Sequence, residues 1–448
     1  MQQQPRFLKH LLLILVLGCL FTPHAFATND NNESEIITLK PSEVERFTTA
    51  IAQVKKLYVT PVEDKDIFNG AIRGMLNELD PHSAFLDEMA YKALKEHANG
   101  TFVGIGVEIA QEKGITKVIS PIDDTPAEKA GIQAGDYILA INGKQLIDMP
   151  MEQIILTMRG KKGTTLTLTV LHQKSQTPKT ITIKRDVIHV KSIKSKLLDD
   201  GYGYIRIAYF QRETGKQMTQ AIHALLKQEK APLKGLVLDL RNNPGGILES
   251  SADVADAFLD SRKLKKNALI VYTKGRKTSS QLKEKAHVGD ILNGAPMVVL
   301  INQGSASAAE IVAGALQDHR RAIIMGQQSF GKGSVQTIFP LDNKTALKLT
   351  TALYYTPNGH SIQAKGITPD IAVDPLVVKQ SKEDAMFFLN LHETDLENHL
   401  DNGNKNKNVD QKKTNTSLKQ LATKDYQLYE ALRLLKAMHV MKRHLRES

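Results

Sequence analysis

Asn302–Gln336 reads NQGSASAAEIVAGALQDHRRAIIMGQQSFGKGSVQ, and this stretch decides the fold around it. The apolar run Pro296–Ile301 just before it has the length and composition of a buried strand. Ala308–His319 combines helix formers with apolar residues and predicts a helix. Ala322–Gly326, bounded by polar and glycine residues, predicts a second short buried strand. Ser307 is therefore expected at a strand-to-helix turn.

Ser307 and Lys332 are a candidate nucleophile and general base. A serine hydroxyl is a weak nucleophile until a neighbouring base removes its proton. A lysine can be that base only when neutral, so its pKa must fall from about 10.4. Burial can lower the pKa of a lysine by about 3–5 units. The neighbours Phe330, Gly331 and Gly333 favour close packing around Lys332.

A hydrolase of this kind also needs donors for the oxyanion that forms on the substrate carbonyl. Helix N-termini offer free backbone N–H groups, so the amide of Ala308 is one candidate. A second predicted strand, Gly235–Leu240, runs into Arg241-Asn242-Asn243-Pro244-Gly245-Gly246. Glycines let backbone amides approach a ligand closely, so Gly245 or Gly246 could supply the second donor. The residues alone do not choose between them.

Simpler interpretations of the same residues stay open at this point. Ser305 or Ser307 could serve only as the N-cap of the helix, and the glycines could form an ordinary turn. His319 and His360 allow a Ser-His alternative, and His360 is the better placed of the two.

Composition excludes several other classes of protein. The 448 residues allow two or three domains, and 41% apolar with 24% charged residues is typical of a soluble globular protein. One cysteine and no tryptophan exclude a disulfide framework and a cysteine metal cluster. The net charge of +11 comes without a nucleic-acid motif, so no nucleic-acid partner is expected. No metal or nucleotide motif is present, and no cofactor is expected.

Residues 1–27 have the pattern of a secretory leader. A basic start precedes the apolar run Leu11–Phe21, which is too short to span a bilayer. Cleavage is expected after Ala27. In the alternative, Val16–Cys19 is a bacterial lipoprotein box and Cys19 carries lipid; the mass of the mature N-terminus distinguishes the two. Either route leads to the periplasm or cell envelope of a bacterium.

The segment after the leader is expected to be helical. Ser42-Glu43-Val44-Glu45 matches a capping box, and Val44, Phe47, Ile51, Val54 and Tyr58 repeat at helical spacing as one apolar stripe. A second helix is predicted at about Lys65–Leu79. It runs into Asp80-Pro81-His82-Ser83, whose histidine is assigned no catalytic role.

Four sequence motifs together resemble those of the C-terminal processing peptidases, also called tail-specific proteases. The motifs are DLRNNPGG at 239–246, NQGSASAAEI at 302–311, GQQSFGKGSVQT at 326–337 and YYTPNGHSIQAKGITPDI at 354–371. The resemblance extends over nearly the whole chain after the leader. It implies that Ser307 is the nucleophile, Lys332 the general base and Gln336 a supporting residue. It also implies oxyanion donors at Ala308 and the Gly245-Gly246 turn.

Residues 98–187 resemble a PDZ domain of the bacterial permuted type. PDZ domains add a peptide as an extra strand and hold its terminal carboxylate with loop amides. The alternative is that the helical residues of this set belong to the core of the module. The residues expected to bind a substrate tail are Gly104, Ile105, Gly106, Val107, Ile154, Ile155 and Met158.

The strand–helix alternation from Gly203 onward predicts an α/β core. The resemblance implies βα units like those of crotonases and Clp proteases, with an inserted mainly-β PDZ domain and helical segments at both ends. The last helix is predicted at Asp425–Leu445. The expected boundaries are a signal peptide at 1–27, an N-terminal helical segment at 41–95, the PDZ domain at 98–187, the serine protease core at 190–375, and a C-terminal helical segment at 376–448 with a disordered linker at about 402–416.

The sequence therefore predicts a secreted bacterial serine endopeptidase with a Ser-Lys dyad and no cofactor. Its substrates are expected to be envelope proteins with apolar C-terminal tails. The family resemblance also implies that the protein forms a homo-oligomer of two or more chains and acts with a lipoprotein adaptor. Two alternatives are a catalytically inactive PDZ scaffold or chaperone, and an acyl-transfer enzyme acting on small thioesters. The leader and the PDZ module argue against the second.

Overall fold

The computed structural model describes residues 38–112, 114–122, 124–172, 175–198, 201–264, 268–376 and 421–447. The predicted leader and the predicted linker at about 402–416 lie outside these residues. The chain divides into two units, Met1–Phe68 and Asn69–Ser448. No helix in the described ranges is long and apolar enough to cross a membrane.

Helix α1, Pro41–Leu57, is the main element of the first unit. The predicted capping box is wrong, because the helix begins at Pro41 and Lys40 occupies the N-cap position without a side-chain hydrogen bond. Proline suits the first helical position, since it lacks an N–H and its φ is already helical. The predicted apolar stripe has no buried member, and Val44, Phe47, Val54 and Tyr58 are exposed.

Helix α2, Asp64–Asn77, is followed by strand β1, Ala84–Leu86, and helix α3, Glu88–Asn99. Asp87 caps α3 by accepting a hydrogen bond from the backbone N–H of Ala90. Gly100 ends the helix in the left-handed conformation, with a φ of 67°.

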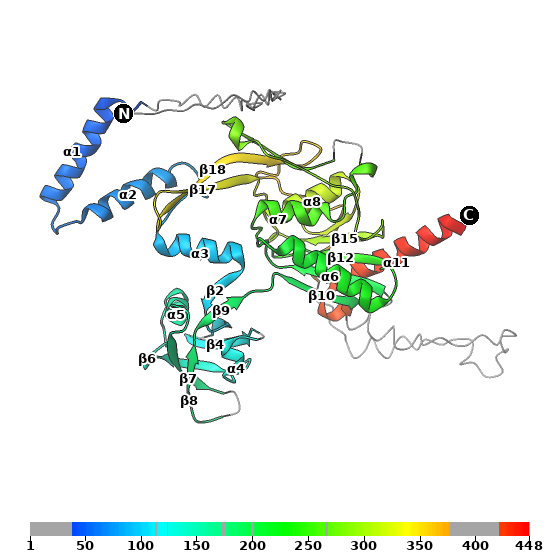
Figure 1. Ribbon diagram of the computed structural model, residues 1–448, viewed down its shortest axis with the longest axis horizontal. Helices are drawn as coiled ribbons and strands as arrows, with labels where there is room; N and C mark the ends of the chain where they lie inside the picture. The colour runs from blue at the N-terminus through cyan, green and yellow to red at the C-terminus, as the bar shows by residue number, and fades with distance from the viewer. Residues whose placement is uncertain are drawn as a thin grey trace, which may run out of the picture. The chain divides into compact units, whose positions relative to one another are not determined.

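The module predicted as a PDZ domain is a small sheet with its own core (Figure 1). Strict alternation buries Leu166, Leu168 and Val170 in β7, which is the pattern of a strand with one solvated face. The sheet has the order β3-β4-β5-β7-β8, with β6 paired to β5, while β2 and β9 form a separate two-stranded ribbon. The elements are β2 Thr101–Gly104, β3 Val107–Glu112, β4 Ile115–Pro121, α4 Pro126–Lys129, β5 Tyr137–Ile141, β6 Lys144–Gln145, α5 Met151–Met158, β7 Thr165–Leu171, β8 Lys179–Lys184 and β9 Asp186–His189.

The main sheet has the order β10-β11-β12-β15-β16-β19 and lies between helices (Figure 1). All pairs are parallel except β10 with β11. Every residue of β12 and β15 is buried, as expected when both faces of a parallel sheet are covered. The elements are β10 Ile193–Leu198, β11 Tyr202–Ile207, α6 Thr214–Glu229, β12 Gly235–Asp239, α7 Leu248–Asp256, β15 Met297–Ile301, α8 Ala308–Asp318, β16 Ile323–Gly326, β19 Ile371–Ala372 and α11 Tyr426–Glu447.

Two apolar clusters pack on opposite faces of this sheet. Helices α6, α7 and α8 pack on one face, where Leu238 and Leu240 point. Helix α11 packs on the other, where Leu428, Leu432 and Leu435 meet Val237, Val298, Leu300 and Met325. The α/β core, the mainly-β module and the terminal helices agree with the predicted fold class.

A second sheet supplies the remaining wall of the core. It runs β1-β18-β13-β14, with β17 also paired to β18. Strand β1 therefore connects the segment after α2 to the strands that follow Lys332. The elements are β13 Leu269–Gly275, β14 Lys283–Lys285, β17 Ser334–Pro340 and β18 Ala346–Tyr355, with short 3-10 turns at Ser261–Lys263 and Thr278–Ser280.

Candidate active site

Ser307 occupies a strained turn between β15 and the first residue of α8. Its backbone has a φ of 55° and a ψ of −116°, outside the conformations that non-glycine residues usually adopt. Such strain costs about 1–3 kcal/mol and persists only where surrounding contacts impose it. The close approach of the Ser307 side chain requires glycine at position 245, because a Cβ added there would lie 2.7 Å from the Cβ of Ser307.

Ser305 fixes the turn rather than capping the helix. Its hydroxyl donates to the carbonyl oxygen of Leu240 at 2.8 Å and accepts from the backbone N–H of Asn302 at 3.0 Å. The Ser305 side chain therefore joins the end of the β15 turn to the end of β12.

The two candidate glycines differ in hydrogen bonding. The amide of Gly245 donates to Asn243 Oδ1 at 2.9 Å, so it is already occupied. Within the described residues, the amides of Gly246 and Ala308 donate no hydrogen bond. Gly246 has a φ of 141°, and a Cβ there would lie 2.1 Å from the carbonyl oxygen of Phe210. Only glycine fits this position.

Glu310 joins the turn of Ser307 to the loop of Lys332, a role not among those predicted from the sequence. Its side chain is fully buried in the first turn of α8. One carboxylate oxygen accepts from the backbone N–H of Ser307 at 2.7 Å and of Lys332 at 2.9 Å. The other accepts from Ser329 Oγ at 2.6 Å and the Gly331 N–H at 2.7 Å. One buried carboxylate therefore fixes both backbones, and its capping-box spacing in Ser307–Glu310 was the available signal.

Burial raises the pKa of Glu310, although these four hydrogen bonds oppose the rise. The carboxylate supplies the acceptor for each of these four donors, which would otherwise lie in the site without one.

Lys332 lies half-buried after the loop that Glu310 holds. Burial lowers its pKa, and the nearby ammonium of Lys348 lowers it further, while Asp80 and Glu310 oppose the change. The direction is the one that a lysine base requires. Gly333 packs tightly as predicted, since a Cβ there would lie 2.4 Å from the Gln363 nitrogen. Phe330 does not contribute to the burial in the way its sequence position indicated, because its side chain is 65% exposed.

The side chains of Ser307 and Lys332 are not joined in this conformation. Among the described residues no hydrogen bond links Ser307 Oγ to Lys332 Nζ, and none links Gln336 to the Lys332 side chain. Gln336 Nε2 donates instead to Ser334 Oγ at 2.9 Å and to Thr350 Oγ1 at 3.4 Å. Catalytic hydrogen bonds are often long or absent before substrate binds, so this geometry does not exclude the pair.

Tyr354 lies beneath the candidate nucleophile. Its side chain is 1% exposed, and its hydroxyl forms no well-aligned hydrogen bond within the described residues. Burial raises the pKa of Tyr354 well above its usual value, and the Ser307 side chain is close enough to oppose that rise. The tyrosine is therefore a neutral neighbour of Ser307.

The Asp80-Pro81-His82-Ser83 turn lies close to the candidate base, a proximity not predicted from the sequence. The Asp80 carboxylate accepts from the backbone N–H groups of His82 and Ser83 at 2.7 and 2.9 Å, from Ser83 Oγ at 2.7 Å and from Thr350 Oγ1 at 3.1 Å. Thr350 Oγ1 is the atom that Gln336 also contacts. A chain of hydrogen bonds thus runs from this turn to the predicted supporting glutamine.

Six of the seven predicted tail-binding residues line a small cavity in the mainly-β module. The cavity has a volume of about 180 Å³. Ile155 is 38% exposed, and Met158 is nearly buried. Ile154 does not line the cavity, because its side chain is fully buried in the module core. The cavity is lined by Phe102, Gly104, Ile105, Gly106, Val107, Ile109, Ile155, Met158 and Arg159.

Comparison with known proteins identifies the family of the chain. It is 47% identical over 362 residues to the "Carboxy-terminal-processing protease" of Bartonella bacilliformis, covering 80% of each chain. The chain belongs to the carboxy-terminal processing proteases. Further members are "Carboxy-terminal processing protease CtpA" of Bacillus subtilis, 36% identical over 74% of this chain and 69% of the relative, and "Probable CtpA-like serine protease" of Staphylococcus haemolyticus, 34% identical over 82% and 72%.

Three family models match successive parts of this processing protease. "Activating protease CtpB N-terminal domain" matches residues 22–90, "PDZ domain" matches 93–171, and "Peptidase family S41" matches 201–373. The protein is therefore a serine-type peptidase whose α/β core carries an inserted PDZ domain. The resemblance drawn from the four sequence motifs is confirmed.

The two alternative histidines of the processing protease have other contacts. A ring nitrogen of His319 is 2.6 Å from the carbonyl oxygen of Leu269. His360 is exposed and lines a polar cavity together with Asp318 and Lys365. Neither histidine forms a hydrogen bond with Ser307 in the described part of the chain. His82 lies close enough to the candidate base for the charge of Lys332, together with burial, to lower its pKa.

The charges around Lys332 predict two opposite shifts in the pH dependence of cleavage. If Lys332 is the general base, it acts when neutral, so the rate should rise with pH through the pKa of Lys332. Lys348→Gln removes a charge that lowers this pKa, so the midpoint should move to higher pH. Asp80→Asn removes a charge that raises it, so the midpoint should move to lower pH. Cleavage rates of each variant across the pH range measure both shifts.

Lys344→Gln is the matched control for these variants. Lys344 is a neighbouring lysine whose Nζ pairs with Glu88 at 3.1 Å, and it does not act on the pKa of Lys332. Its midpoint should equal that of the unchanged protease. A midpoint that disappears in His82→Gln would assign the titration to that histidine, and shifts of the same sign in Lys348→Gln and Asp80→Asn would contradict the electrostatic explanation.

Proposed function

We propose that this protein is an exported tail-specific serine endopeptidase in which Ser307 and Lys332 form the catalytic dyad. The observation that carries the proposal is the Glu310 carboxylate, which accepts from the backbone of both residues. The buried Glu310 carboxylate binds both loops and fixes their positions relative to each other. The Lys332 side chain forms no hydrogen bond in the described residues that would oppose its rotation toward Ser307. The S41 and PDZ matches give the same class of activity.

The proposed reaction starts when neutral Lys332 accepts the proton of Ser307 Oγ. The oxygen attacks the carbonyl carbon of the scissile peptide bond, and the Gly246 and Ala308 amides donate to the resulting oxyanion. We prefer Gly246 to Gly245 because the Gly245 amide already donates to Asn243. Lys332 then protonates the leaving amine. Water then attacks the acyl-enzyme while neutral Lys332 accepts its proton. Lys332 returns this proton to Ser307 Oγ as the acid product leaves.

The conformation described here requires one movement before reaction. Lys332 Nζ must approach Ser307 Oγ, and Gln336 must leave Ser334 or Thr350 if it is to support the lysine. The missing dyad contact favours one alternative function, a catalytically inactive PDZ scaffold or chaperone. Cleavage of casein by the purified protein, with Ser307→Ala as control, separates the two functions.

The proposed location is the bacterial periplasm or cell envelope, reached through the leader at residues 1–27. The proposed substrates are envelope proteins with apolar C-terminal tails, assisted by a lipoprotein adaptor. We also propose a homo-oligomer of two or more chains. Support for it comes from the exposed apolar residues of α1, among them Val44, Phe47 and Val54. Analytical ultracentrifugation tests this, because a purely monomeric protein would contradict it.

Tail recognition predicts that the protease distinguishes substrates by their last residue. The amides of the Gly104–Val107 loop would bind a free terminal carboxylate, and the apolar cavity would take the last side chain. A charge-assisted hydrogen bond contributes about 1.5–3 kcal/mol, so amidating the tail should weaken recognition roughly 10- to 150-fold. Cleavage rates of one unfolded substrate with a free apolar tail, an amidated tail and an Asp-terminated tail measure the preference.

A pair of isoleucines gives the control for this prediction. Ile155 lines the cavity, whereas Ile115 lies on β4 outside it, and both are 38% exposed. Ile155→Asp should remove the preference for an apolar tail, and Ile115→Asp should keep it. Equal rates on all three tails by the unchanged enzyme would mean that the PDZ domain does not recognise C-termini.

A further inference from the structure

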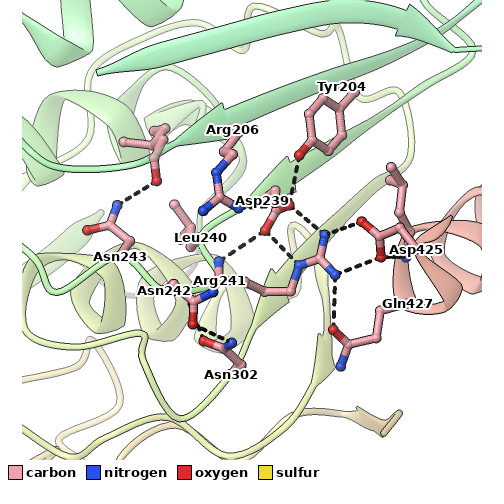
Figure 2. A network of polar contacts seen from close by, with 12 residues as sticks. Tyr204, Arg206, Asp239, Leu240, Arg241, Asn242, Asn243, Asn302, Asp425 and Gln427 are labelled. Carbon is pink, nitrogen blue, oxygen red and sulfur yellow. Dashed lines mark hydrogen bonds and ion pairs between the residues drawn. The ribbon is translucent and has the colours of Figure 1, made fainter. Parts of the chain in front are cut away.

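Arg241 is bound from both sides in the network of Figure 2. Its five N–H donors all have acceptors, which is the full capacity of a guanidinium. Nε and Nη2 donate to the two oxygens of Asp239 at 2.9 and 2.7 Å. Nη1 and Nη2 donate to the two oxygens of Asp425 at 2.8 and 2.7 Å, and Nη1 also donates to Gln427 Oε1 at 3.0 Å.

The two sides of this network belong to different parts of the fold. Asp239 is the last residue of the central strand β12, is completely buried, and also accepts from Tyr204 Oη at 2.8 Å. Asp425 and Gln427 lie at the start of α11, where Asp425 also accepts from the backbone N–H of Leu428 at 3.1 Å. Arg241 therefore connects the C-terminal helix to the end of the central strand.

The residue after Arg241 begins the turn that holds the candidate oxyanion amide. Alternation along the chain places Asp239 and Arg241 toward α11, and Leu238 and Leu240 toward the face on which α8 packs. Asn242 has a φ of 56°, and its backbone N–H donates to Asn302 Oδ1 at 2.8 Å. Arg241, held from the opposite face of the sheet, thus directly precedes this turn in the chain.

We propose that α11 positions the oxyanion turn 242–246 through the contacts of Asp425 and Gln427 with Arg241. Asp425 and Arg241 are then positioning residues for catalysis, and they act from the face of the sheet opposite to the one on which α8 packs. This inference rests on the proposed function in one respect, because it takes the Gly246 amide as an oxyanion donor. Misplacing such a donor slows the formation of the tetrahedral intermediate while leaving the binding of substrate unchanged.

The test replaces one carboxylate oxygen with an amide. Asp425→Asn keeps the size of the side chain but turns an N–H group toward the guanidinium. We expect kcat to fall about 10- to 100-fold with KM nearly unchanged, and affinity for a peptide boronate, whose adduct occupies the oxyanion site, to fall in parallel. Asp425→Glu restores the carboxylate and should recover part of kcat.

Asp290→Asn is the matched control, because Asp290 and Arg321 form another largely buried ion pair, with a closest N–O distance of 3.0 Å. Loss of this ion pair should lower the melting temperature about as much as Asp425→Asn does, and it should leave kcat and boronate affinity unchanged. A folded Asp425→Asn protein with the kcat of the unchanged enzyme would overturn the proposal, as would an equal loss of kcat in Asp290→Asn.

Hydrogen exchange separates this proposal from the proposed function. The amides of Asn242, Asn243 and Gly245, which are hydrogen-bonded in this turn, should exchange faster in Asp425→Asn than in Asp290→Asn, whether or not the protein cleaves peptides. If the unchanged protein cleaves nothing, the proposed function fails, yet faster exchange at this turn still supports the positioning role. Exchange at the turn equal to that of the unchanged protein contradicts the role, whatever the activity.

Discussion

Cleavage of an unfolded protein substrate is expected to fall roughly 10³- to 10⁶-fold when either Ser307 or Lys332 becomes alanine. Ser307 would supply the nucleophilic oxygen and Lys332 the group that accepts its proton. Because the two would act as a unit, the double variant should be no less active than either single variant. Initial rates on casein and on one defined peptide measure the three losses.

Both single variants should remain folded, because the Lys332 side chain forms no hydrogen bond in the described residues and the Ser307 side chain contributes only the capping-box contact at the start of α8, whose loss costs about 1 kcal/mol. The Glu310 contacts use the backbone N–H groups of Ser307 and Lys332, which alanine keeps. Thermal unfolding should therefore change little, and Lys344→Ala serves as a lysine control. Substantial cleavage by Lys332→Ala that still needs Ser307 would remove lysine as the base and direct attention to His82 or His360.

Glu310→Gln is expected to produce the second large effect, on both stability and activity. The amide group can replace the oxygen that faces Ser329 and Gly331, where the serine hydroxyl can reverse its hydrogen bond but the Gly331 N–H cannot. A buried donor without an acceptor costs about 1–3 kcal/mol, so the free energy of unfolding should fall by that amount. Displacement of the Lys332 loop should lower kcat roughly a hundredfold. Chemical denaturation and cleavage rates measure the two effects.

Glu249→Gln is the control for this substitution. Glu249 occupies the first turn of α7, as Glu310 does in α8, but its side chain is exposed. It should change stability by less than about 0.5 kcal/mol and leave the rate unchanged. A Glu310→Gln protein with the stability and kcat of the unchanged enzyme would show that the carboxylate does not fix the two loops.

The sequence predicted the elements of the core because each has a local cause. The apolar run before Asn302 became β15, and the helix formers after Ser307 became α8. The strained turn between them follows from the same pattern. The apolar pattern could not separate core residues from cavity residues on α5. Ile154 and Ile155 are adjacent and equally apolar, yet Ile154 is buried in the module core and Ile155 lines the cavity.

Contacts between residues far apart in the chain could not be predicted from the sequence. Asp80 meets Thr350, and Arg241 meets Asp425, across separations of 270 and 184 residues. No local pattern in either segment encodes those pairings. The contact between Glu310 and the Ser307 backbone could have been predicted, because a glutamate three residues after a serine has the spacing of a capping box.

Covalent labelling tests the central claim most directly. A peptidyl diphenyl phosphonate reacts with an activated serine by forming a P–O bond to it and losing phenol. Intact mass and peptide mapping should show one adduct per chain, on Ser307, and labelling of Lys332→Ala should be roughly 10²- to 10⁴-fold slower. An adduct on another residue, or Lys332→Ala labelled as fast as the unchanged enzyme, would contradict the Ser307–Lys332 dyad.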